Sequence, residues 1–479
     1  MAITDATAVS AWRPAIWRRS LSHYPNRVPR IAYLAIAVAA TMVVYYELYV
    51  SGGVATLQLQ HFHMSFGFYT LFIALSNIVS AFGALAAGLA DRLGRVNLVV
   101  FGLLVGSLFV EVVIPNAPNA TALAVETCVL GAVEGIVLVA APALIRDFSP
   151  QVGRSTAMGF WLLGPIGGSF VVSVVATNTL PVLGSWQSQY YICGAIGLLT
   201  FLVGFLWLRE LSPQLRDQLM VSERDRILVE ARAKGINLEE SLKHPWRQMA
   251  RFRVIAPAFA YSIALLMYST IAGFGTVYFT TVFGFSLSEA NGVAIWGWVC
   301  DAILCIALGV VSDRLRIRKP FIVALGLLMA LAIGMFIVIT GGHPGFAAVS
   351  VVVGFLAGMI GAFSAPWLAA FTETVEDVNP ALTATGLAIW GWFIRLCVGV
   401  AFLILPHVVH SVGGQATGSA AAQWNDWFWG CLIVALFVVP LTLVMKGRWT
   451  PSAARRDAEA HDLMLKDEIA ALAPASEEV

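Results

Sequence analysis

The chain has 479 residues, of which 59% are hydrophobic and 12% are charged, and its formal net charge is +1 at pH 7. Soluble domains carry about 25% charged residues, so a soluble protein of this composition could not cover its surface with polar groups. The near-zero net charge excludes a strongly basic surface for nucleic acid. We therefore expect the lipid bilayer to surround much of this chain.

The first 30 residues contain five arginines and three prolines but no apolar core, so we expect no cleavable signal peptide. The first apolar run begins near Ile31 and is long enough to cross a bilayer. We interpret residues 1–30 as a cytoplasmic tail and the run after it as the first membrane helix.

Twelve stretches approach the roughly 20 apolar residues that a membrane-crossing helix needs. We predict spans at residues 31–55, 66–90, 97–114, 121–145, 155–178, 189–208, 255–281, 289–312, 320–340, 347–371, 382–406 and 427–445. The six cysteines lie singly in apolar runs without zinc-ligand spacing. We predict no metal site and no cofactor.

The basic residues indicate the orientation. Of the 29 lysines and arginines, all but Arg395 lie on the face that also holds both chain ends. Short loops, which carry the positive-inside signal, show the same bias. We predict a multi-pass protein of the cell membrane with its N terminus, central loop and C terminus in the cytoplasm.

The apolar spans and the polar stretches before, between and after them divide the chain into five segments. We predict an N-terminal tail (1–30), a six-helix bundle (31–208), a polar cytoplasmic linker (209–253), a second six-helix bundle (254–445) and a C-terminal tail (446–479).

Internal repeats support two related halves. Asp91-Arg92 follows the second span, and Asp313-Arg314 follows the eighth. A finer repeat places Trp-Gly-Trp in the eighth span, at residues 296–298, and again in the eleventh, at residues 390–392. These two copies are three helices apart, which is typical of inverted three-helix repeats. The predicted fold class is an all-α membrane protein with twelve helices in two pseudo-symmetric six-helix bundles.

The loop after the second span reads Asp91-Arg92-Leu-Gly94-Arg95, and it resembles the signature loop of the major facilitator superfamily. Its second copy keeps Asp313 and Arg314. The resemblance implies that these six residues form gating elements that stabilise one access state: Asp91, Arg92, Gly94, Arg95, Asp313 and Arg314. The alternative is that the arginines only anchor the helix ends at the cytoplasmic surface.

The first span contains Tyr46-Glu47-Leu-Tyr-Val-Ser-Gly, which resembles the acidic motif of aromatic-acid and sugar proton symporters. The resemblance places Glu47 at the position of the motif's acid and implies proton coupling there. The alternative is a neutral, hydrogen-bonded structural glutamate. The helix-four arginine of many family members is missing, and Thr127 stands at the best-matching position.

A charged group in mid-membrane costs about 2.5–3.5 kcal/mol on insertion scales, so such residues are candidates for function. Glu134 lies mid-helix between glycines, and we predict it as a second proton-coupling residue, with a structural hydrogen-bonding role as the alternative. Glu111 and Glu126 lie near the outer helix ends, and we expect them to reach the membrane interface.

Arg395 keeps its charge at any useful pH. We predict that it binds a carboxylate group of the substrate, because a guanidinium matches that group in a bidentate way. Trp392 lies on the same helix face and is predicted to stack on Arg395. Asp301, the residue at the corresponding position of the repeat, is a second predicted substrate contact. The alternative is an ion pair between Asp301 and Arg395.

Several aromatic residues lie in mid-span rather than at the interfaces where tryptophan usually collects. They predict a cavity lined by rings that suits an organic substrate, with ordinary helix packing as the alternative. The predicted lining residues are Tyr46, Trp161, Trp296, Trp298, Trp390 and Trp392.

Together these features predict a secondary active transporter that moves a small organic solute by alternating access. Proton symport of an organic or aromatic carboxylate, or of a sugar-like compound, is the leading hypothesis. The alternatives are proton-driven efflux of drugs or metabolites, and a membrane sensor that does not transport. The sequence shows no metal cluster, nucleophile elbow or phosphate loop, so we predict no enzyme. The expected partners are the solute, protons and the bilayer, with no nucleic acid, and we expect a monomer.

Overall fold

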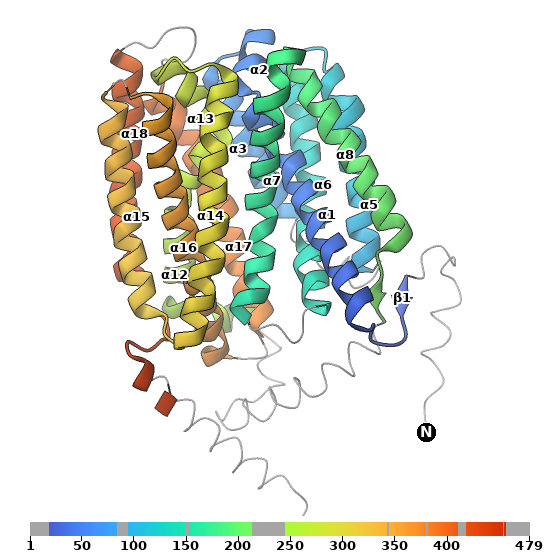
Figure 1. Cartoon of the computed structure of the whole chain (residues 1–479), viewed down its shortest axis with the longest axis vertical. Helices are drawn as coiled ribbons and strands as arrows, with labels where there is room; N and C mark the ends of the chain where they lie inside the picture. The colour runs from blue at the N-terminus through green and yellow to red at the C-terminus, as the bar shows by residue number, and fades with distance from the viewer. Residues whose placement is uncertain are drawn as a thin grey trace, which may run out of the picture.

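The computed structural model describes residues 19–83, 94–148, 154–212, 245–342, 344–379, 382–410, 418–453 and 455–456. Within these ranges, twelve helices are long and apolar enough to cross a membrane. They stand side by side in one bundle (Figure 1). The twelve predicted spans are therefore confirmed. Parts of the predicted tails and linker, at residues 1–18, 213–244 and 457–479, lie outside the described residues.

The first six spans form the N-terminal half. Its helices are α1 (Arg27–Gly53), α2 (Ala55–His61), α3 (Phe66–Gly83), α5 (Arg95–Leu108), α6 (Ala120–Asp147), α7 (Arg154–Leu183) and α8 (Trp186–Trp207). The third span continues beyond α5 as a π-helical turn, η4 (Phe109–Val113), and a 3-10 turn, η5 (Ile114–Asn116).

The last six spans form the C-terminal half. A short helix, α11 (Pro245–Met249), precedes α12 (Phe252–Ala264), α13 (Leu266–Val282), α14 (Leu287–Leu315), α15 (Lys319–Thr340), α16 (Phe346–Val378), α17 (Thr383–Val408) and α18 (Gly418–Thr442). Helices α12 and α13 together form the seventh span.

All twelve spans are helical because lipid offers no hydrogen-bond partner to an open backbone. Two of them are nevertheless interrupted. The first breaks at Val54, between α1 and α2, and the seventh breaks at Leu265. The predicted seventh span, at residues 255–281, is therefore present but divided. Such breaks are tolerated only where other parts of the protein satisfy the freed backbone groups.

The two ends of the bundle differ in charge. We call the end where α1 and α5 begin, at Arg27 and Arg95, and where α14 ends, at Leu315, the basic end. It lies at the bottom of Figure 1, on the side where strand β1 is labelled. The opposite end, which holds His61 and Leu183, is called the far end.

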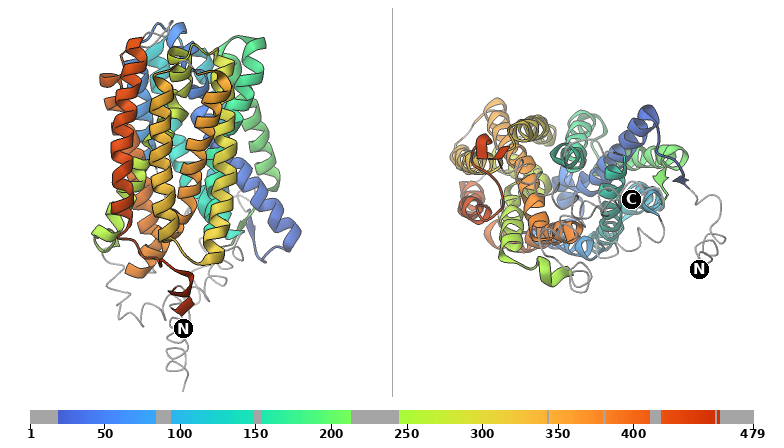
Figure 2. Two further views of the ribbon diagram at one scale, coloured as in Figure 1. Left: turned by 60° about the vertical axis from the view of Figure 1, so that its left-hand side comes forward. Right: turned by 90° about the horizontal axis from the view of Figure 1, so that it is seen from below.

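The halves meet along two helix pairs. Helix α7 packs along α14, and α3 packs along α17. The view from below shows the blue-to-green helices of the N-terminal half beside the yellow-to-red helices of the C-terminal half (Figure 2). This pairing confirms the predicted fold class of two six-helix bundles.

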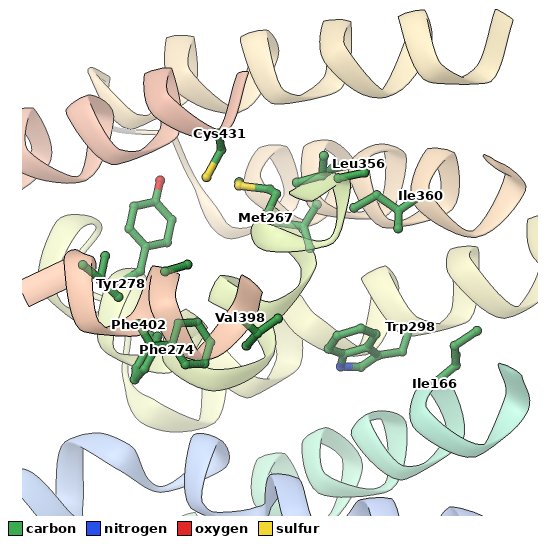
Figure 3. Close-up of a cluster of buried hydrophobic side chains, with 14 of the residues drawn as sticks. Ile166, Met267, Phe274, Tyr278, Trp298, Leu356, Ile360, Val398, Phe402 and Cys431 are labelled. Carbon is green, nitrogen blue, oxygen red and sulfur yellow. The ribbon is translucent and has the colours of Figure 1, made fainter. Parts of the chain in front are cut away.

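The interior and the outer surface are both apolar. Figure 3 shows buried side chains such as Phe274, Phe402 and Tyr278 packed between helices. The outer surface also carries exposed apolar side chains, including Val338 (76% exposed) and Val351 (70% exposed). Water would disfavour so much exposed apolar area, whereas lipid accepts it.

A short two-stranded sheet ties the chain before the first span to the end of the sixth. Strand β1 (Ser20–Leu21) pairs in parallel with β2 (Glu210–Leu211). The neighbouring Arg19 donates hydrogen bonds to the carbonyls of Gly204 (3.3 Å) and Phe205 (2.8 Å), at the end of α8. Its cation suits the negative end of that helix.

Candidate functional site

Glu47 lies deep in the N-terminal half and is 2% exposed. Its Oε1 accepts a 2.6 Å hydrogen bond from the Ser107 hydroxyl of α5. A Cβ at Gly106 would lie 2.7 Å from Oε2, and one at Gly197 of α8 would collide with Oε1. The carboxyl group therefore points between α1, α5 and α8, away from the contact between the halves.

Glu134, in the middle of α6, is 1% exposed. Neither of its carboxyl oxygens has a hydrogen-bond partner among the described residues. It lies within electrostatic range of Glu47, Tyr45 and Tyr49, which are all on α1. Because an unpartnered buried carboxylate is costly, this position indicates either a bound proton or a partner that arrives with the substrate.

Arg395, on α17 of the C-terminal half, is partly exposed. It forms no ion pair with any described residue. The hydroxyls of Tyr45 and Tyr49, on α1 of the other half, lie within electrostatic range of it. The structure thus brings Arg395 and Glu134 to the same pair of tyrosines. An unpaired arginine at this contact can bind an anionic group.

Asp301 lies elsewhere in the C-terminal half. It is 2% exposed and packs against α16, where a Cβ at Gly361 would collide with its carboxylate. The ion pair between Asp301 and Arg395 that the sequence left open is not formed between these two described residues. The aromatic neighbours of Asp301 are Tyr261 and Tyr268.

The predicted aromatic residues separate into two groups. Trp298 and Trp390 are each 5% exposed. Trp298 donates a 3.1 Å hydrogen bond to Ser173 of α7, in the other half. Trp390 packs on Tyr261 and Trp367, with ring centroids 5.7 and 5.9 Å away.

Trp296 and Trp392 are instead 55% and 41% exposed, so they do not share the buried surroundings of Trp298 and Trp390. Two residues along a helix turn the side chain by about 200°, so Trp296 faces away from the side that buries Trp298. Trp392 contacts Phe393 rather than stacking on Arg395. Tyr46 is buried (1% exposed), and the side chain of Trp161 lies outside the described residues.

The sequence analysis missed a hydrogen-bonded seam between the halves at the far end. The break after Gly53 exposes carbonyls of α1, and donors from the C-terminal half satisfy two of them. Thr276 donates to Gly52 O (2.6 Å), and Asn291 donates to Gly53 O (3.0 Å). We call these two bonds the far-end seam. The Gly52-Gly53 pair within the first span was the available signal.

The far-end seam encloses a cavity of about 20 Å³, lined among others by Tyr49, Ser169 and Trp298. This is room for about one water molecule. The far end is therefore closed to an organic solute along this path.

Replacing Thr276 with valine is expected to loosen the far-end seam. Valine keeps the shape of the side chain but removes the donor, and one hydrogen bond contributes about 1 kcal/mol. The population with an open far end should rise about fivefold. The measurement is the rate at which an impermeant maleimide modifies a cysteine introduced at Ser169, which is 3% exposed.

The matched control is Thr280→Val, since the Thr280 hydroxyl bonds to Thr276 O (2.8 Å), within its own helix. Modification of the native cysteines is measured without the Ser169→Cys change and subtracted. Equal rates in the two valine variants would show that the seam does not hold the far end closed.

The predicted gating residues lie at the basic end. Asp91 and Arg92 fall outside the described residues. Gly94 has a φ of 93°, in the region that favours glycine. Arg95 forms an ion pair with Asp147, at 2.9 Å, and its backbone N–H donates to Glu210 (2.7 Å). The start of α5 is therefore fixed to the end of α6 and to β2, which follows α8.

The second copy has a similar arrangement but a different arginine. Asp313 pairs with Arg318 (2.7 Å), and Arg318 also reaches Glu373 near the end of α16 (3.2 Å). Arg314, which was predicted as a gating residue, is exposed. Arg318 was missed because it follows Asp313 by five residues and stands outside the Asp-Arg match.

We expect Arg318→Ala to destabilise the protein, because it removes hydrogen bonds to two carboxylates from a side chain that is only 11% exposed. Hydrogen bonds to charged groups contribute about 1.5–3 kcal/mol, and the free energy of unfolding should fall by about that amount. Thermal unfolding of the purified protein measures the change. Arg314→Ala is the control, and an equal loss in both variants would contradict the assignment.

The family model described as Major Facilitator Superfamily matches residues 37–401. Two solved structures share the fold. A D-xylose-proton symporter has a TM-score of 0.63 and 17% identity, over 85% of this chain and 97% of the other. A bacterial homologue of the human lysosomal transporter Spinster, in an inward-facing and occupied conformation, has a TM-score of 0.60 and 14% identity, over 90% and 98%.

Curated relatives match a shorter stretch. Vesicular glutamate transporter 1 of Bos taurus is 28% identical over 200 residues, which is 40% of this chain and 34% of that protein. Probable anion transporter 3, chloroplastic, of Oryza sativa subsp. japonica is 26% identical over 241 residues, which is 48% and 45%. The matches thus span about a third to a half of the length of these relatives.

Proposed function

Because the chain belongs to the Major Facilitator Superfamily, and is therefore a membrane transporter, we propose that it carries a small organic anion together with protons. The two halves would expose one central site to each side of the membrane in turn. The observation that carries this proposal is Arg395, a cation that forms no ion pair with any described residue. It lies within electrostatic range of the two tyrosines that also interact with Glu134.

The charge of Arg395 supports a carboxylate as the substrate group. A neutral sugar would leave this arginine without a counter-charge in the membrane, which is unfavourable. The matches to proteins named as glutamate and anion transporters agree with an anion. Trp390, Trp298 and Asp301 would shape the surroundings of the site rather than bind the charge.

Glu134 and Glu47 are the proposed proton-coupling residues. Glu134 neighbours the same tyrosines as Arg395, so its protonation and the binding of an anion can influence each other through charge. Glu47 lies farther from the contact between the halves than the tyrosines do. It accepts a hydrogen bond from Ser107 and is within electrostatic range of Glu134.

We propose that the basic end faces the cytoplasm, in accord with the positive-inside bias. The closed far-end seam would then correspond to a state that is shut on the outer side. The segment limits proposed from the sequence agree with this orientation, since the tails and the linker all attach at the basic end.

The test is uptake into liposomes that contain the purified protein, with the external medium more acidic than the interior. Radiolabelled L-glutamate, benzoate and D-xylose serve as probes. We expect at least one carboxylate to accumulate above its external concentration, and a protonophore to abolish the accumulation. Accumulation of xylose alone would overturn the anion assignment. Movement of a cationic dye against the proton gradient, with no carboxylate uptake, would support the efflux alternative.

A further inference from the structure

Glu47 has no direct opening to the contact between the halves. Its carboxyl group lies behind α1, against α5 and α8, and the far-end seam closes the space on the other side of α1. If Glu47 exchanges a proton with the far side, the proton needs a route through the N-terminal half itself. This question rests on the proposed function, in which Glu47 takes part in proton coupling.

A second carboxyl group lies along the same helix pair. Glu111 lies in η4, the π-helical turn that follows α5. It is four residues beyond Ser107, so the two side chains lie on one face of the span. A Cβ at Gly194 of α8 would collide with Glu111 Oε2, much as one at Gly197 would collide with Glu47 Oε1. Two carboxyl groups thus occupy the space between these helices, about one helical turn apart.

Glu111, which is expected from the sequence to lie near the membrane interface, has a partly exposed side chain in the structure. Its Oε2 is buried and has no hydrogen-bond partner among the described residues. Isolated π-helical turns occur frequently at functional sites. Here the turn begins at Phe109, two residues before Glu111.

Cys193 interacts electrostatically with all the carboxyl groups of this region. This residue of α8 is fully buried, and it lies within electrostatic range of Glu47, Glu111 and Glu134. Glu134 is itself buried and unpartnered, and it is in range of Glu47. Three carboxyl groups on η4, α1 and α6 therefore form a series from the far-end part of the third span to the tyrosines beside Arg395.

We propose that Glu111 is the outer member of a proton relay that loads Glu47 from the far side, through the space between α5, η4 and α8. The Glu111 carboxylic acid gives its proton to the Ser107 hydroxyl, directly or through one water molecule. Ser107 gives its own proton to the Glu47 carboxylate, along the hydrogen bond that the structure shows. Glu111 is left as a carboxylate and takes a new proton from water at the far end.

Glycine is required at two positions of this relay. Gly194 and Gly197 leave the space that the carboxyl groups occupy, and any larger side chain there would displace them. The relay runs separately from the path of the solute, so the proton can arrive while the far-end seam is closed.

The test needs no substrate. Infrared spectroscopy of the full-length protein in lipid nanodiscs detects the carbonyl stretch of protonated carboxylic acids, and the band that is lost in Glu47→Gln belongs to Glu47. Transfer to D₂O shifts this band as the proton exchanges. We expect Glu111→Gln to slow the exchange of the Glu47 band by about tenfold or more.

Glu126→Gln is the matched control, because Glu126 is also a membrane glutamate with a buried, unpartnered Oε2 but is not in the series. We expect it to leave the exchange rate unchanged. Ser107→Ala, which removes only a hydroxyl group, is expected to slow exchange as well and provides a second variant if Glu111→Gln fails to fold. Glu111→Asp retains the acid and should retain most of the rate.

Unchanged exchange in Glu111→Gln or in Ser107→Ala would overturn the relay, and so would a wild-type protein without a Glu47 band. Equal slowing by Glu126→Gln would show a general change in solvent access and would also overturn it. A failure of the proposed transport is a separate result, because it would appear as absent carboxylate uptake in liposomes.

Discussion

Arg395→Lys is expected to raise the KM for a carboxylate substrate by roughly tenfold to a hundredfold. Lysine keeps the positive charge but loses the planar fork that binds both carboxylate oxygens. The loss of one charge-assisted hydrogen bond corresponds to about 1.5–3 kcal/mol. Initial rates of uptake into liposomes, measured over a range of concentrations of the accumulated carboxylate, give the change.

The structure predicts that this change leaves folding almost intact, because Arg395 has no ion-pair partner among the described residues. The thermal unfolding temperature and the yield of purified protein provide the control. If both fall as steeply as transport does, Arg395 has a structural role and the anion site must be sought elsewhere.

Glu47→Gln is expected to abolish accumulation against a concentration gradient while exchange of labelled for unlabelled substrate continues. Glutamine has the same shape, and its carbonyl oxygen can still accept the hydrogen bond from Ser107, but it cannot carry a proton. Uptake should then stop when the internal and external concentrations are equal, and its rate should no longer respond to external pH. The final accumulation ratio and the rate of counterflow are the two measurements.

Glu126→Gln is again a suitable control, since this glutamate also lies in a membrane span but outside the proposed series. It should accumulate substrate as the wild-type protein does. If Glu47→Gln still accumulates substrate to the wild-type ratio, Glu47 does not couple protons to transport. Glu134 would then be the remaining candidate.

The twelve spans were predictable because each depends only on the apolar length and the charges of its own stretch of sequence. A bilayer selects for apolar length and for the side on which arginine and lysine lie, and neither depends on distant contacts. The presence of an arginine in the eleventh span was visible for the same reason. Its neighbours, Tyr45 and Tyr49, were not, because they come from the first span.

The direction of each side chain could not be predicted in the same way. Helix α1 is apolar on most of its surface, so its sequence does not show which face meets α5 and α8 and which meets the other half. Glu47 was therefore recognised as a candidate but not placed behind the central contact. Glu111 was assigned to the interface because its position near a helix end is compatible with either direction.

The break in the first span depends on partners from more than two hundred residues away. Thr276 and Asn291 satisfy the carbonyls of Gly52 and Gly53, and no local pattern identifies such donors. The same limit applies to the second gating loop, because its sequence does not show which arginine reaches Asp313. Arg318 forms ion pairs with both Asp313 and Glu373, although it lies outside the Asp-Arg match.

The far-end seam consists of neutral groups: a hydroxyl and an amide that donate to two backbone carbonyls. Breaking these bonds moves no net charge across the membrane, and salt does not screen them as it screens ion pairs. The opening of this end should therefore be almost independent of membrane voltage and ionic strength. Any electrical sensitivity of the cycle must then come from charged groups elsewhere, such as the carboxyl groups of the N-terminal half and Arg395.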